Sequence, residues 1–320
     1  MTVRLTPEWQ GRLRDYAPVA TLVALVLVVG AFSPAFLDAN TLMLLAGDTA
    51  TLFIMAAGLT FVIMLGGIDL SVQAVASLAS VVMAASLPAV GGLCVLVAVA
   101  SGVLAGFISG VAQTRLRIPS FIATLAVSGI AAASALVLSG SRSVPIPPDL
   151  RATMFAWAAG HSFGLPNDIL VALAVLGVSL FVERATVFGR WSIAVGAGEP
   201  AALVAGVPVD RVKVMALCVS GGLAALAGVV MGARLSSGSP TLANEFLLPA
   251  VAAVCVGGTA LTGGVGSVLR TLVGALIVSV VRIGMTFINV DPFAQQIVFG
   301  AVLVAAVAAT IDRSKIPIVK

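Results

Sequence analysis

Residues 41–71 read TLMLLAGDTATLFIMAAGLTFVIMLGGIDLS. As far as residue 65 the stretch is apolar apart from Asp48 and a few small polar residues, without the alternation of a half-buried strand. A helix of about 20 residues crosses a bilayer, so this run is long enough to span. A glycine-rich polar break over residues 66–71 follows, and a second apolar run then begins. We expect a spanning helix that is interrupted near one membrane face.

The composition of the whole chain supports a membrane protein. Of its 320 residues, 60% are hydrophobic and 9% charged, and the mean hydropathy is +1.17. Soluble domains are about 45–50% apolar and about 25% charged. In lipid every backbone polar group must be paired internally, so only helices or a closed barrel can span. The long unalternating runs exclude barrel strands. The sequence therefore predicts an all-α, polytopic integral membrane protein.

Ten apolar segments divide the chain into about ten transmembrane helices, including interrupted ones. They lie at 18–32, 41–65, 72–88, 90–113, 121–139, 168–182, 213–233, 246–258, 267–284 and 293–310. Several are shorter than a full span, and those that flank residues 66–71 and 258–266 are separated by glycine-rich breaks. We expect a single transmembrane domain over residues 1–320.

The distribution of basic residues predicts the orientation. If the spans alternate from a cytoplasmic N-terminus, 13 of the 17 basic residues fall on the cytoplasmic side. The other four are Arg142, Arg151, Arg234 and Arg282. Because cytoplasmic loops carry an excess of Lys and Arg, both termini are expected in the cytoplasm. The net charge of +4 thus indicates topology, and no basic face suited to nucleic acid is present.

Three hydrophilic segments accompany the spans. In residues 1–17, Thr6 precedes a proline, and Trp9, Leu13 and Tyr16 recur at helical spacing. This pattern predicts a short cytoplasmic interfacial helix, with a disordered tail as the alternative. Residues 140–168 form a Pro- and Ser-rich periplasmic loop, and residues 184–213 form a cytoplasmic loop.

The cytoplasmic loop contains helix start and stop signals. Pro200 suits a first helical turn, and Glu199 places negative charge at the positive end of the helix dipole. Gly206 suits a left-handed stop, with Pro208 after it. A short helix over about 199–205 is predicted, and a plain connecting loop is the alternative.

No pattern in the chain indicates catalysis. His161 stands alone in the outer loop, and the cysteines have no metal spacing. The cysteines are Cys94, Cys218 and Cys255. The glycine runs lack the lysine of a phosphate-binding loop, so ATP would be hydrolysed on a partner chain. The spans carry no series of acidic residues for a proton relay, which disfavours an ion-coupled secondary transporter.

Five stretches in order make the chain resemble the ribose-type permeases, the membrane subunits of bacterial monosaccharide ABC importers. They are Gly66-Gly67-Ile68-Asp69-Leu70-Ser71-Val72, Pro119-Ser120-Phe121-Ile122-Ala123-Thr124-Leu125, the inner loop at 194–208, Ala233-Arg234-Leu235-Ser236-Ser237-Gly238 with Pro240, and residues 256–266. The resemblance extends from about residue 40 to the end. Two positions depart from the usual pattern, namely Gly198 in place of Asn and Gln73 in place of Gly.

The resemblance implies a non-enzymatic permease subunit of the cell inner membrane. Its partners would be a second permease copy, two ABC ATPase domains that hold ATP and Mg, and a periplasmic sugar-binding protein. The chain itself would bind no cofactor. The cargo would be a ribose-like pentose, a hexose or a related polyol. A permease for nucleosides or branched-chain amino acids is the alternative.

The resemblance also assigns candidate site residues. The coupling helix toward the ATPase would comprise Gly198, Glu199, Pro200, Ala201, Ala202, Val204 and Gly206. Its apolar contact face is expected to be Ala201, Ala202 and Val204. The helix breaks near the pathway would comprise Gly66, Gly67, Asp69, Ser71, Gly257, Gly258 and Thr259. Sparse amides, Gln73, Asn289 and Gln295, are candidates to line the pathway.

Overall fold

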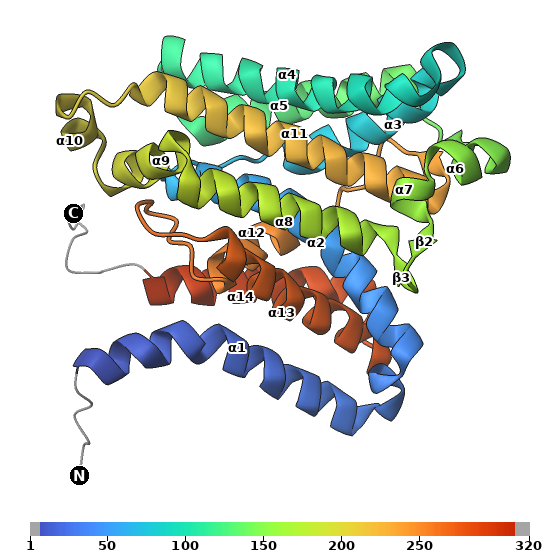
Figure 1. Cartoon of the computed structure of the whole chain (residues 1–320), viewed down its shortest axis with the longest axis horizontal. Coiled ribbons are helices and arrows are strands. Elements are labelled where there is room, and N and C mark those ends of the chain that lie inside the picture. Colours follow the sequence, from blue (N-terminus) through green and yellow to red (C-terminus); the bar gives the residue numbers. More distant parts are fainter. Residues whose placement is uncertain (1–6, 311–320) are drawn as a thin grey trace.

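The computed structural model describes residues 7–310, with the side chains of residues 18–291 and 294–305. This part is almost entirely helical (Figure 1). The long helices are α1 (Pro7–Phe32), α2 (Ala39–Met64), α3 (Val72–Val90), α4 (Cys94–Arg115), α5 (Ser120–Ser139), α8 (Asn167–Ala185), α11 (Val209–Leu235), α13 (Val268–Phe287) and α14 (Pro292–Thr310). The shorter ones are α6 (Pro148–Met154), α7 (Ala156–Ala159), α9 (Val187–Ala197), α10 (Glu199–Val204) and α12 (Leu247–Val256), with 3-10 turns η1 (Pro34–Leu37) and η2 (Gly91–Leu93).

Each of the ten predicted apolar segments coincides with one of these helices. Five helical stretches are long and apolar enough to cross a membrane, with α3 and α4 counted as one stretch; the bent pair α8 and α9 would make a sixth. Shorter apolar helices lie at Pro18–Phe32, Leu247–Val256 and Ala294–Ala305. The prediction of a mostly helical membrane protein is confirmed at this level.

The N-terminal helix differs from the expected one. Helix α1 runs from Pro7 to Phe32 with Pro18 inside it, so no boundary separates residues 7–17 from the first apolar segment. Thr6 lies outside the described residues, as do the side chains of Trp9, Leu13 and Tyr16.

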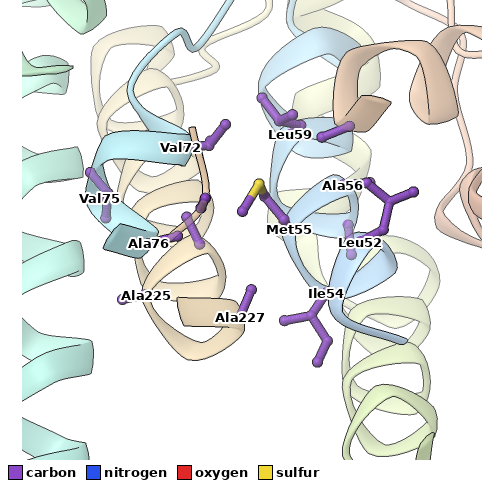
Figure 2. Close-up of a cluster of buried hydrophobic side chains, with 14 of the residues drawn as sticks. Leu52, Ile54, Met55, Ala56, Leu59, Val72, Val75, Ala76, Ala225 and Ala227 are labelled. Atoms are coloured by element: carbon purple, nitrogen blue, oxygen red, sulfur yellow. The ribbon is translucent and has the colours of Figure 1, made fainter. Parts of the chain in front are cut away.

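Two helices, α2 and α11, occupy the centre of the bundle. Every residue of α2 from Thr49 to Met64 is buried, and α2 is surrounded by α8, α11, α12 and α13. A helix that is apolar on all sides can be buried on all sides. Figure 2 shows Met55 of α2 pointing toward Ala76 of α3, with Ala225 and Ala227 of α11 nearby.

A glycine face brings α4 and α11 together. Gly102, Gly106 and Gly110 recur every four residues on α4 and lie against α11. A Cβ on Gly106 would overlap the carbonyl oxygen of Leu217, and one on Gly110 would lie 2.8 Å from Val214 Cα. Small residues let membrane helices approach at backbone distance, where dispersion contacts hold them.

The two ends of the bundle differ. Helix α10 protrudes at one end, called here the α10 end, where α1 begins and α14 ends (Figure 1). At the opposite end lie α6, α7 and the hairpin of β2 (His161–Ser162) and β3 (Leu165–Pro166). The predicted outer loop is ordered there, because β1 (Val144–Pro145) pairs antiparallel with β4 (Ser237–Gly238).

Candidate functional site

The two predicted glycine-rich breaks lie next to each other. The first joins α2 to α3 and the second joins α12 to α13. The backbone N–H of Gly264 donates to the carbonyl oxygen of Met64 at 2.9 Å. Gly66 and Gly263 both have positive φ, of 75° and 83°, which glycine adopts without steric cost. The breaks are therefore one contiguous structure, not two separate loops.

Asp69 ties the first break to the central helix α11. Its side chain is 1% exposed. One carboxylate oxygen accepts from the Ser71 backbone N–H at 2.9 Å and from Ser71 Oγ at 2.6 Å. The other accepts from Ser220 Oγ of α11 at 2.7 Å. Three donors thus replace the water that a buried carboxylate loses.

The first turns of α5 hold the other side of this break. The backbone N–H of Ile68 donates to Ser120 Oγ at 3.0 Å, and that of Leu70 donates to Thr124 Oγ1 at 3.1 Å. Both hydroxyls belong to residues 119–125, one of the five stretches that resemble the ribose-type permeases. They accept hydrogen bonds from backbone N–H groups that have no helical partner at the break. The two stretches are about 50 residues apart in the sequence, and only the structure brings them together.

The second break is held mainly by backbone packing. A Cβ on Gly257 would lie 2.5 Å from the carbonyl oxygen of Arg270, so α12 and α13 touch closely there. Gly258 has φ of 93°. Thr259 is 1% exposed, and the described residues supply no hydrogen-bond partner for its Oγ1.

Helix α9 crosses both breaks and was not predicted from the sequence. A Cβ on Gly196 would overlap both the carbonyl oxygen of Met64 and the backbone nitrogen of Gly264. The helix has a recognisable signal, because the apolar residues Phe188, Trp191 and Val195 recur at i, i+3 and i+7 and pack in the core. It turns by 68° from α8 and leads directly into α10. This close contact links the α10 segment to the breaks.

The short helix predicted over 199–205 is present as α10, Glu199–Val204. Gly206 has φ of 80°, as the left-handed stop requires. The predicted contact face was wrong at one position: Ala202 is 4% exposed because it faces the protein. Ala201 and Val204 are exposed as predicted, Val204 at 91%, and the other large exposed apolar side chain is that of Leu203, at 56%.

Glu199 has a partner within the chain. Its Oε2 lies 2.7 Å from the Nζ of Lys213 on α11. Lys213 and Ser220 are seven residues apart, so they lie on the same side of α11 two turns apart. One face of α11 therefore contacts α10 through Lys213 and the first break through Ser220.

The three candidate pathway amides do not come together. Gln73 is at the start of α3, beside the first break. Asn289 follows α13 and is exposed, and the Nε2 of buried Gln295 donates to Thr286 Oγ1 at 3.3 Å. The length of α13, about 30 Å at 1.5 Å per residue, separates these two from the breaks. They do not form a single polar site with Gln73.

Replacing Ser220 with alanine should weaken the fold measurably. The change leaves the buried Asp69 carboxylate with one donor fewer, and a hydrogen bond to a charged group contributes about 1.5–3 kcal/mol. We expect a lower Tm for the purified variant. Ser279→Ala is the matched control, because the described residues supply no hydrogen-bond partner for this buried hydroxyl. Equal Tm values for the two variants would contradict the role given to Ser220.

The interrupted helices, the central buried helix and the protruding α10 make up the framework of a transport permease. A family model described as "Branched-chain amino acid transport system / permease component" matches residues 41–307. The chain belongs to this family of permease components, which are multi-pass membrane proteins and transport subunits. The resemblance inferred from the five stretches is confirmed.

Individual relatives match almost the whole chain. The ribose import permease protein RbsC of Haemophilus influenzae is 34% identical over 291 residues, 90% of each chain. The probable ABC transporter permease protein YphD of Escherichia coli is 35% identical over 301 residues, 93% of this chain and 90% of the relative. The L-arabinose transport system permease protein AraH of E. coli is 33% identical over 314 residues, which cover 95% of this chain and 92% of the relative.

Proposed function

We propose that this chain is the permease subunit of an ATP-driven importer for a monosaccharide, a pentose or a related hexose or polyol. The observation that carries the proposal is the similarity, over at least nine tenths of each chain, to permeases named for ribose and arabinose. The family description mentions branched-chain amino acids, and a permease for those solutes is the second candidate. The relatives favour the sugar.

The proposed importer has further subunits. A separate ATPase supplies the energy and a periplasmic binding protein delivers the sugar, as in binding-protein-dependent ABC import. We propose two copies of the permease and two ATPase domains. In this arrangement α10 is the coupling helix, since it is the exposed helix between α9, which touches both breaks, and α11. ATPase closure would move α10, and α9 and α11 would pass the movement to the breaks.

The proposed topology has ten spans with the α10 end in the cytoplasm. Basic residues at or near the helix ends of the α10 end outnumber those at the opposite end, as the positive-inside rule requires. Those of the α10 end are Arg115, Arg117, Arg184, Arg190, Arg211, Lys213 and Arg270, against Arg142, Arg151, Arg234 and Arg282.

An impermeant maleimide applied outside intact cells should label His161→Cys and miss Val204→Cys, in a background with the native cysteines replaced. Both native side chains are exposed in the structure, so accessibility to the reagent reports the side of the membrane. Labelling of Val204→Cys in intact cells, with His161→Cys protected, would reverse the orientation.

Vesicles that contain the permease, its co-purifying ATPase and its binding protein should import D-ribose or L-arabinose only when ATP is supplied. The permease alone should import neither sugar under a proton gradient, because the acidic residues of its spans form no proton relay. Uptake driven by the proton gradient alone would indicate a secondary transporter. ATP-driven uptake of leucine without sugar uptake would favour the amino-acid alternative.

A further inference from the structure

Four charged side chains from four helices form a row of ion pairs at the end opposite α10. Arg282 of α13 pairs with Asp48 of α2. Arg234 of α11 lies 3.8 Å from Asp48 and 3.2 Å from Asp168 of α8. The signs alternate and the four charges cancel. Ionisable residues in spanning segments are costly, and they commonly mark a substrate path.

Close contacts with the main chain help to position this row of ion pairs. A Cβ on Gly47 would lie 2.9 Å from Asp168 Oδ2, so α2 approaches the ion pair closely at this residue. Asp168 is almost completely buried, with its side chain 3% exposed. The guanidinium of Arg151 donates to the carbonyl oxygens of Ala233, at 3.1 Å, and of Arg234, at 3.4 Å. These contacts fix Arg234 from its backbone and from its side chain.

Two cavities open on either side of Arg234. The larger, of about 440 Å³, is lined by apolar residues such as Met43, Leu44 and Pro166 and by five polar ones, Asn40, Arg151, His161, Asp168 and Arg234. The smaller, of about 290 Å³, is lined by Asp48, Thr51, Phe246, Arg282 and Arg234, among others. The guanidinium carbon of Arg282 lies 4.9 Å from the centre of the Phe246 ring. Ligand pockets begin at about 300 Å³, so the larger cavity is big enough for one small molecule.

The chemistry of the larger cavity fits a neutral ligand rich in hydroxyl groups. Each sugar hydroxyl both donates and accepts hydrogen bonds, so it can donate to Asp168 and accept from Arg234. Asp168 and Arg234 neutralise each other, and the guanidinium of Arg151 already donates to two main-chain carbonyl oxygens. We propose that this cavity is a monosaccharide subsite, where the sugar enters the permease. The inference rests on the proposed function.

Protection of an engineered cysteine tests occupancy directly. Leu44 lines the cavity and is 65% exposed, so an impermeant maleimide should label Leu44→Cys. A sugar at twice its Kd leaves about one third of the sites free, so D-ribose or L-arabinose should slow the reaction about threefold. The control is Phe163→Cys, which is exposed in the hairpin turn at the same end and does not line the cavity. Its labelling should not change.

A variant that fills the cavity gives an independent measurement on the complete importer. Leu44→Trp should lower ATP-driven uptake about tenfold, which corresponds to about 1.4 kcal/mol. Leu42→Trp, on an exposed residue of α2 outside the lining, should retain uptake. Unprotected labelling together with normal uptake by Leu44→Trp would overturn the subsite while leaving the importer intact. Absence of monosaccharide uptake by the unmodified importer would instead overturn the proposed function.

Discussion

Replacing Gly106 with leucine should leave almost no folded protein in the membrane. A Cβ at this position overlaps the carbonyl oxygen of Leu217, which is main chain and cannot rotate away. Helices α4 and α11 would have to separate, and the contacts of Gly102 with Gly221 would be lost as well. Overpacking ordinarily costs about 1–3 kcal/mol, and a backbone collision exceeds that range because no rotamer relieves it. The measurement is the yield of monodisperse protein after extraction in mild detergent.

A glycine elsewhere in the bundle serves as the control. Gly129 of α5 has open space where a Cβ would lie, so Gly129→Leu should give a near-normal yield. The two variants add the same side chain to long apolar helices. Equal yields would show that the glycine face between α4 and α11 is not needed for folding.

Replacing Val204 with arginine should lower both sugar import and the ATP hydrolysis that the loaded binding protein stimulates. The side chain of Val204 is 91% exposed at the end of α10, so the change leaves the permease fold unaffected. If α10 inserts into a groove on the ATPase, a new charge there must be desolvated without a partner, at a cost of several kcal/mol. We expect import to fall more than tenfold, and hydrolysis stimulated by the loaded binding protein to fall with it.

Milder substitutions on α10 provide the controls. Val204→Ala removes two methyl groups and should reduce import only slightly. Glu199→Ala breaks the ion pair with Lys213, which is partly exposed and contributes about 0.2–1 kcal/mol. Ala202→Arg would be a poor test, because the buried Ala202 has no room and the helix itself would be displaced. Normal import by Val204→Arg would remove α10 from the coupling role.

Local chemistry was sufficient to predict where the helices lie. Each apolar run became a helix because a segment in lipid must satisfy its own backbone hydrogen bonds, whatever surrounds it. Helix α10 was predicted within one residue, since Pro200 and Gly206 act on their own neighbours. The positions of both breaks were predicted for the same reason.

Contacts between distant segments could not be predicted in this way. Nothing near Asp69 in the sequence indicates that Ser220, 151 residues away, donates to it. The burial of Ala202 depends on how α10 rests on the bundle. The glycines of α4 recur every four residues in the sequence, but that spacing does not predict that α11 is the helix packed against them.

The sequence by itself determined the class of protein, the helical segments, the positions of the two glycine-rich breaks and the short helix α10. These follow from hydropathy, from backbone pairing in lipid and from the conformations open to glycine and proline. Only the tertiary structure decided that both breaks and α9 meet. It also decided that charged residues from α2, α8, α11 and α13 form a row of ion pairs beside a cavity. The physical reason is that a helix fixes which residues share a face, while the partner of each face depends on packing across the whole bundle.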